Sequence, residues 1–297
     1  MTNQHTPQVI SVSRRTDIPA FYAAWFLNRL RAGFARYRTP FGGQSYEVSL
    51  RPEVVLAFVF WSRNYRPLLP YLPDLEKQGY DGYFHFTLTG LGPPLEPAAP
   101  PVPETIAVFE ILAERYSPKH VLWRFDPIIF SKQTPAAETL ARFDSLARQL
   151  SGYTERCYVS FVDFYHKTER NLRLLAKEGV QCYDPAAEEK VALLRQLVDI
   201  GQQAHIQLRA CCESDLLTVP GVTQAHCVDA ALLAELFPEK FHALKQTPTR
   251  AGCGCFASRD IGAYNTCIAG CAYCYANANH QTALANYQRH DPESPIL

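Results

Sequence analysis

Short apolar runs recur along this chain, and they constrain its fold more than any other feature of the sequence. Each has four to eight residues, is rich in β-branched or aromatic side chains, and mostly lacks alternation with polar residues. The runs are residues 9–12, 54–61, 83–88, 121–125, 157–162 and 206–209. Such runs are typical of strands that are buried on both faces of a parallel sheet.

Segments with helical periodicity alternate with these runs. They are residues 21–32, 68–78, 104–116, 136–150, 168–177 and 185–202. Repeated strand–helix units predict an α/β fold with right-handed crossovers. The strands begin about 30–50 residues apart, which favours a (β/α) barrel of the TIM type, full or partial. A doubly wound open sheet is the alternative.

Charge and apolar content limit the partners that the chain attracts. Its 29 basic and 29 acidic residues give a formal net charge of zero, so no global field draws it to nucleic acid or to an anionic membrane. We do not favour nucleic acid as a partner, although a local basic patch would still allow nucleic-acid binding. The polar start MTNQHTPQ is unlike a signal peptide, and no apolar stretch is long enough to span a membrane. We therefore expect a cytoplasmic protein.

Five of the ten cysteines lie between Cys253 and Cys274. Cytoplasmic cysteines are more often metal ligands than disulfides. Cys267, Cys271 and Cys274 have the spacing C-x3-C-x2-C. Three thiolates on one tight loop can hold three irons of a [4Fe–4S] cluster and leave the fourth iron open to another ligand. A ferredoxin-type carrier would instead need a fourth cysteine at fixed spacing.

This run resembles the cluster motif of the radical SAM superfamily, and the residues around Tyr273 are similar to those of spore photoproduct lyase. The resemblance implies a cluster on Cys267, Cys271 and Cys274 that reductively cleaves S-adenosylmethionine (SAM). The resulting 5′-deoxyadenosyl radical would abstract hydrogen from a substrate that the resemblance does not name. It also implies that Tyr273 packs near the adenine, and that a donor such as flavodoxin or ferredoxin supplies the electron.

Over essentially its full length, the chain is identified as a member of the uncharacterised bacterial DUF1848 family. The segments that carry this resemblance are residues 13–19, 59–62, 210–213 and 253–277. Radical SAM enzymes usually carry the cluster motif after the first strand, whereas this motif lies about 30 residues from the C-terminal end. The resemblance implies a radical-SAM-like barrel with a permuted cluster loop. We expect residues 1–250 to form the barrel-like core and residues 251–297 a cluster segment packed on it, as one integrated domain.

Four further cysteines are enough to complete a second metal site. Cys212, Cys227, Cys253 and Cys255 could hold a second iron–sulfur cluster or a structural zinc. Cys211 is the alternative to Cys212, because neighbours in an extended segment point to opposite sides. Two alternative functions therefore stay open beside the enzyme. One is a non-catalytic iron–sulfur protein for electron transfer or redox sensing. The other is a zinc-stabilised binding module, because a Cys-x-Cys (Cys253 and Cys255) followed by the C-x3-C-x2-C motif could also form a structural zinc site.

Polar residues at the ends of the predicted strands are candidates for binding, because ligands of parallel α/β folds bind there. Two adjacent arginines suit a carboxylate or a phosphate, and the nearby Asp17 is either a helix N-cap or a partner for one of them. An Arg–Asp pair on one side of an extended segment forms either a buried ion pair or contacts to SAM. The candidate cofactor-binding residues are Arg14, Arg15, Arg124, Asp126, Ser160 and Tyr273. The sequence names no catalytic residue.

Overall fold

One eight-stranded sheet organises the protein, and all of its neighbouring strands are parallel. The computed structural model describes residues 7–39 and 43–297. Residues 1–6 of the predicted core, and residues 40–42, lie outside these ranges. In spatial order the strands are β11 (Thr223–Gln224), β10 (Gln207–Ala210), β8 (Arg156–Phe161), β6 (Val121–Ile128), β5 (Gly82–Thr87), β4 (Val55–Ser62), β1 (Gln8–Val12) and β12 (Arg259–Asp260).

The strand order follows the chain in one direction, from β1 at one side to β11 at the other. A doubly wound sheet reverses its strand order at a switch point. The described strands show no such reversal, so the doubly wound alternative is wrong. β12 comes last in the sequence but lies beside β1, at the edge of the sheet. Within the described ranges no pairing joins the edge strands β11 and β12.

The six predicted strands are all present, as β1, β4, β5, β6, β8 and β10. They form because both faces of the sheet are covered. In β4, for example, seven of the eight residues are buried, so a continuous apolar run loses contact with water on both sides. β11 and β12 have only two residues each, and no apolar run predicts them.

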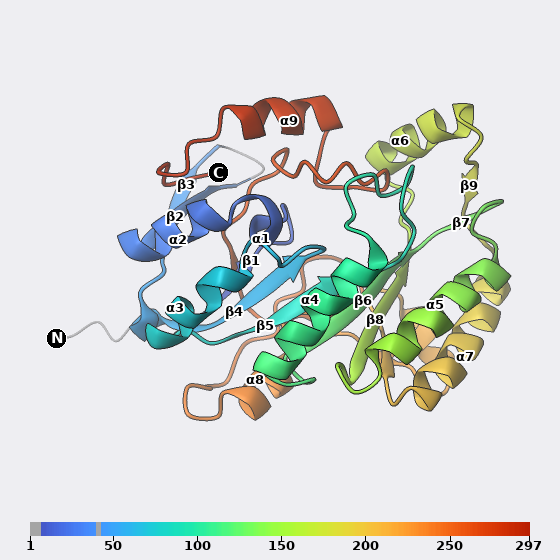
Figure 1. Cartoon of the computed structure of the whole chain (residues 1–297), viewed down its shortest axis with the longest axis horizontal. Helices are drawn as coiled ribbons and strands as arrows, with labels where there is room; N and C mark the ends of the chain where they lie inside the picture. The colour runs from blue at the N-terminus through green and yellow to red at the C-terminus, as the bar shows by residue number, and fades with distance from the viewer. Residues whose placement is uncertain (1–6, 40–42) are drawn as a thin grey trace.

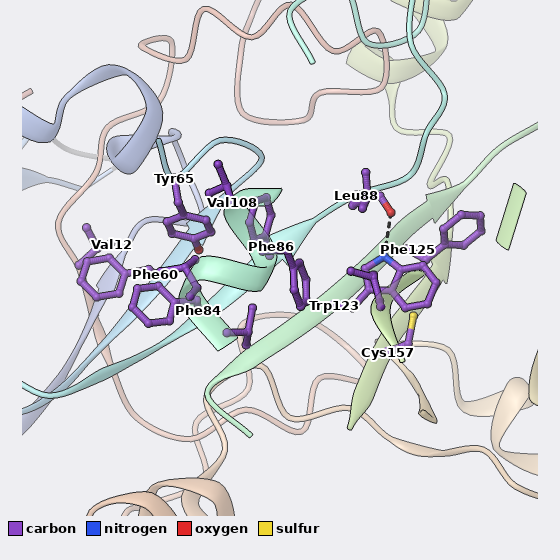
Figure 2. Close-up of a cluster of buried hydrophobic side chains, with 14 of the residues drawn as sticks. Val12, Phe60, Tyr65, Phe84, Phe86, Leu88, Val108, Trp123, Phe125 and Cys157 are labelled. Carbon is purple, nitrogen blue, oxygen red and sulfur yellow. Dashed lines mark hydrogen bonds between the residues drawn. The ribbon is translucent and has the colours of Figure 1, made fainter. Parts of the chain in front are cut away.

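Five helices pack on one face of the sheet (Figure 1). They are α2 (Ala23–Ala32), α3 (Leu72–Lys77), α4 (Val102–Arg115), α5 (Ala136–Leu150) and α7 (Ala187–Gln203). Figure 2 shows aromatic side chains of β5 and β6, among them Phe86, Trp123 and Phe125, gathered in this core. Burying each such side chain stabilises the fold by roughly 1.5–3 kcal/mol. Nε1 of Trp123 donates to the carbonyl of Leu88 at 2.8 Å, so its polar atom is satisfied.

Residues between Cys211 and Phe256 pack on the opposite face, which we call the inner face. Val59, Tyr83 and Tyr158 on the sheet pack there against Val228 and against α8 (Ala230–Leu236). The orange part of the trace in Figure 1 passes α8 and continues behind the strands. Within the predicted cluster segment 251–297, residues 259–260 join the main sheet as β12.

The remaining elements gather mainly near the end of the sheet where the strands finish. They are α1 (Ile18–Phe21), α6 (His166–Lys177), α9 (His280–Gln288), the pair β2 (Phe34–Arg38) and β3 (Ser45–Ser49), the pair β7 (Phe130–Ser131) and β9 (Cys182–Tyr183), and three short 3-10 turns. In Figure 1 this end of the sheet faces the top of the view, where α1, α6 and α9 lie. No helix in the described part of the chain has the length and apolar character needed to cross a membrane.

Candidate metal centre at the carboxyl edge of the sheet

The cysteines of the C-x3-C-x2-C motif lie in a loop of residues 266–277, which we call the cluster loop. Because β12 runs parallel to β1, the chain leaves β12 at the carboxyl edge of the sheet. The hydroxyl of Tyr22, which follows α1, donates to the carbonyl of Thr266 at 2.6 Å. The N–H of Ala272 donates to the carbonyl of Leu95 at 3.0 Å. The cluster loop is thus held over the ends of the strands by segments that follow β1 and β5.

The three motif thiols are unpaired and partly buried in the cluster loop. Burial raises the pKa of each thiol, to about 11 for Cys271, and neighbouring negative groups add to this for Cys267 and Cys271. The backbone N–H of Ala269 is directed at the sulfur of Cys267, and two further backbone N–H groups are directed at Cys274. Hydrogen bonds to cysteine sulfurs stabilise the thiolates that bind a cluster. The residues present therefore fit three corners of a cubane.

Across the described ranges, no three Cys, His, Asp or Glu side chains surround a common point as the ligands of a single ion do. A cubane does not require such convergence, because each of its cysteines binds a different iron.

A buried group of side chains fixes Tyr273. Nη1 of Arg63 lies 2.8 Å from Oε2 of Glu96, and Thr89 also donates to this carboxylate, at 2.6 Å. The hydroxyl of Tyr273 donates to Glu96 and accepts from Arg63. The positive charge of Arg63 also favours the thiolate of Cys271. Sequence reasoning missed Glu96, which lies in a proline-rich loop without a local signal. Its partner Arg63 does carry a signal, because it directly follows a predicted strand.

Asp17 is a helix N-cap, which was one of its two predicted roles. Its Oδ1 accepts from the N–H of Ala20 at 3.0 Å and from the hydroxyl of Ser62 at 2.6 Å, and its Oδ2 accepts from the N–H of Arg63 at 3.1 Å. Burial raises the pKa of Asp17 to about 6 despite these hydrogen bonds. The cap thereby joins the start of α1 to the end of β4, beside Cys267.

Asp260, which the sequence suggests as a residue that orients the cluster loop, is the partner of the two predicted arginines, and this pairing was not predicted. Its carboxylate lies 3.7 Å from Nε of Arg14 and 3.9 Å from Nε of Arg15. It also accepts hydrogen bonds from the hydroxyls of Ser11 and Ser13, at 3.0 and 2.6 Å. Two guanidinium groups share this one carboxylate, so positive charge is in excess at the end of β1.

Arg124 and Asp126 form a largely buried ion pair, and an ion pair was one of their two predicted arrangements. Ser160 donates to Asp126, so these three predicted residues make one hydrogen-bonded group. Nη1 of Arg124 lies 3.3 Å from the sulfur of Cys227, and its guanidinium carbon lies 5.2 Å from the ring centroid of Trp61. The group lies at the carboxyl end of the inner face.

Trp61 and His85 stack on this inner face with ring centroids 4.2 Å apart. Nε2 of His85 lies 2.7 Å from the carbonyl of Cys227, and because a carbonyl only accepts, Nε2 carries the hydrogen. Burial lowers the pKa of His85 to about 4, so the ring is neutral and Nδ1 is an acceptor. Among the described residues, Nδ1 of His85, Nε1 of Trp61 and Nη1 of Arg14 are buried without a hydrogen-bond partner. These atoms mark a place where a ligand or water completes the hydrogen bonding.

The four cysteines of the predicted second site also lie on the inner face, together with Cys211. The sulfur of Cys211 lies 3.7 Å from that of Cys227 and 3.9 Å from that of Cys212. The two remaining cysteines of the chain lie elsewhere. Cys157 is buried among the aromatic side chains of the helix-covered face (Figure 2), and Cys182 lies in β9.

Fold and site together define an α/β protein with a cysteine-rich loop over the carboxyl edge of a parallel sheet. The chain belongs to the DUF1848 family, whose model, described as a domain of unknown function, matches residues 9–276. No curated protein matches the sequence.

Three solved structures show distant likenesses to this chain. Dihydropyrimidinase from Brevibacillus agri NCHU1002 is 12% identical, with 77% of this chain and 44% of that chain covered and a TM-score of 0.32. D-Hydantoinase from a Bacillus sp. AR9 is 8% identical, with 71% and 42% covered and a TM-score of 0.32. A further D-hydantoinase is 10% identical, with 79% and 44% covered and a TM-score of 0.31. The chain spans less than half the length of each, and likenesses this weak carry no argument about function.

Proposed function

We propose that this protein is a radical SAM-type enzyme that holds a [4Fe–4S] cluster on Cys267, Cys271 and Cys274. The cluster loop is the observation that carries the proposal, because it combines three partly buried thiols with backbone N–H groups directed at the sulfurs of Cys267 and Cys274. Three thiolates leave one corner of a cubane without a protein ligand. In the enzymes that the motif resembles, SAM binds at that corner.

The place of β12 supports a radical-SAM-like partial barrel in permuted form. In the enzymes that the motif resembles, the cluster loop follows the first strand. In this protein it follows β12, which lies beside β1 and therefore takes the first place in the spatial order. A strand order that runs in one direction suits a barrel that is open between β11 and β12.

When bound, the reduced cluster supplies the electron that cleaves SAM to methionine and a 5′-deoxyadenosyl radical, which abstracts hydrogen from the substrate. The chain's own residues bind and orient the reactants. Arg14 and Arg15 offer guanidinium groups to a carboxylate, because they share Asp260 as a counter-charge. Trp61 and His85 offer buried, unpartnered polar atoms to a substrate on the inner face.

Three further candidates for SAM contact lie at the same edge of the sheet. Arg124, Asp126 and Ser160 form one hydrogen-bonded group there, and its polar atoms suit the ribose hydroxyls or the methionine end of SAM. The ring of Tyr273 is held in place through its hydroxyl by Glu96, which suits the predicted contact with adenine.

The reaction also requires an electron donor and a reducing environment. We propose a cytoplasmic enzyme that receives electrons from a flavodoxin or a ferredoxin, because ten unpaired thiols need a compartment in which they stay reduced. A net charge of zero gives no general attraction for nucleic acid, so we do not favour a nucleic-acid substrate.

Binding of SAM to the reconstituted cluster tests the proposal. The protein is reconstituted anaerobically with iron and sulfide and reduced with dithionite, and its electron paramagnetic resonance spectrum is recorded with and without SAM. We expect SAM to shift the spectrum, because it binds the open iron. A full cluster whose spectrum is unchanged would favour an electron-transfer or redox-sensing protein. A colourless protein with stoichiometric zinc would favour the zinc-stabilised binding module.

A further inference from the structure

The inner face of the sheet carries more thiols than the proposed SAM site uses. The sulfur of Cys211 contacts those of Cys227 and Cys212, at 3.7 and 3.9 Å. Cys253 and Cys255 pack in the same buried cluster, and the side chain of Cys255 interacts with that of Cys227. Three separate segments, which follow β10, follow β11 and precede β12, therefore bring five cysteines to one place.

Two arginines are directed at sulfurs of this group. Nη1 of Arg124 lies 3.3 Å from the sulfur of Cys227, and Arg250 hydrogen-bonds the side chain of Cys212. Each arginine also pairs with an aspartate. Arginine stays charged and only donates, so its best partner is an anionic acceptor. The surroundings of Cys212 and Cys227 therefore suit thiolates, which is the form that binds metal.

Glycines bring the Cys-x-Cys segment close to the other cysteines. Gly252 has a φ of +69°, and a Cβ there would lie 3.2 Å from the carbonyl oxygen of Cys212. A Cβ on Gly254 would lie 2.6 Å from the ring of His226, which precedes Cys227. Side chains at these two positions would hold the segment away, so the close approach depends on glycine.

We propose that Cys212, Cys227, Cys253 and Cys255 hold a second [4Fe–4S] cluster on the inner face. The hydroxyl of Thr249, 3.4 Å from the sulfur of Cys253, supplies a third hydrogen bond to this group. Four thiolates coordinate every iron of a cubane, so this cluster has no corner for SAM. The proposal goes beyond the radical SAM function and does not depend on it.

Cys211 is not a ligand of this cluster. Arg250 and Arg124 hydrogen-bond the sulfurs of Cys212 and Cys227, whereas the sulfur of Cys211 contacts those two cysteines. Cys211 therefore offers a matched control, with the same chemistry at the same place.

Iron analysis of a chain without the first site tests the proposal. The Cys267→Ala/Cys271→Ala/Cys274→Ala variant is reconstituted anaerobically with iron and sulfide. We expect about four irons per chain, against about eight in the wild type. Adding Cys227→Ser should remove this iron, whereas adding Cys211→Ser should leave it in place. A triple variant that binds no iron, that binds one zinc instead, or that keeps its iron after Cys227→Ser would overturn the proposal.

The single variant Cys227→Ser keeps the test decisive if the triple variant fails to fold. In the otherwise wild-type chain it should lower the iron content from about eight to about four per chain, and an unchanged content would overturn the second cluster. A triple variant that retains iron, together with a wild type whose spectrum does not respond to SAM, would overturn the radical SAM function alone. The two proposals can therefore fail separately.

Discussion

Arg63 and Glu96 form an ion pair in the interior, with 2.8 Å between Nη1 and Oε2 and side chains only 13% and 2% exposed. Arg63 directly follows β4, Glu96 lies in the proline-rich loop after β5, and both contact Tyr273 of the cluster loop. The pair therefore links the cluster loop to two central strands. A buried pair of this kind adds little net stability but is costly to break.

Glu96→Gln should destabilise the protein strongly, because it leaves the charge of Arg63 buried without its counter-ion. We expect the free energy of unfolding to fall by about 3–5 kcal/mol in chemical denaturation. Glu104→Gln is the matched control, since its ion pair with Arg66 is exposed and is worth about 0–1 kcal/mol. Equal losses in the two variants would contradict the role given to Glu96.

Asp260→Asn should disturb both the sheet edge and the cluster loop. The carboxylate accepts from Ser11, Ser13 and the N–H of Arg14, and an amide would turn an N–H2 toward some of these donors. We expect a loss of about 2–4 kcal/mol in unfolding free energy, together with a lower iron content after reconstitution. Asp74→Asn removes an exposed carboxylate near Lys77 and should change neither quantity. An Asp260→Asn variant with full stability and iron would count against this account.

His85 should make the stability of the iron-free protein depend on pH. Burial lowers its pKa from 6.5 to about 4 in the folded chain. Below pH 6.5 the unfolded chain therefore binds a proton that the folded chain does not. The free energy of unfolding should fall as the pH drops from 6.5 to about 4, by up to about 3 kcal/mol.

Denaturation at a series of pH values, compared with His85→Gln, measures this contribution. The variant should lose the part of the pH dependence that His85 supplies. His280→Gln, at an exposed position in α9, should follow the wild type. If the His85→Gln curve parallels the wild-type curve, the neutral buried state of His85 is wrong.

Cys157→Ala should leave the iron content unchanged, because Cys157 lies in the aromatic core of the helix-covered face (Figure 2). The loss of its buried sulfur should lower the free energy of unfolding by about 1 kcal/mol. Cys271→Ala should instead remove the iron of the first cluster. Iron and sulfide analysis of the two reconstituted variants separates a packing role from a ligand role. Loss of iron from Cys157→Ala would refute the packing role.

The central strands were predictable from the sequence because a strand covered on both faces needs a continuous apolar run. The run at residues 54–61 predicts β4 (Val55–Ser62) to within one residue at each end. β12 could not be predicted in this way. Its residues, Arg259 and Asp260, are polar, and only their pairing with β1 makes them a strand. The strand that explains the place of the cluster loop therefore has no local signal.

The candidate site was predictable only in part, for the same reason. The spacing of Cys267, Cys271 and Cys274 marks them as a set without any knowledge of the fold. The partner of Arg14 could not be found, because Asp260 lies 246 positions away along the chain. Alternation predicted that Cys211 and Cys212 point to opposite sides, which is wrong. Both lie on the inner face with their sulfurs 3.9 Å apart, because Cys212 has a φ of +60° and the segment is not extended there.

Release of 5′-deoxyadenosine tests the central claim most directly. The reconstituted protein is reduced with dithionite and given SAM, and the products are separated by chromatography, with Cys271→Ala as the control. The radical SAM assignment predicts that the wild type releases 5′-deoxyadenosine and that the variant does not. A wild-type protein with a full cluster that neither binds nor cleaves SAM, or equal release by the variant, would contradict it.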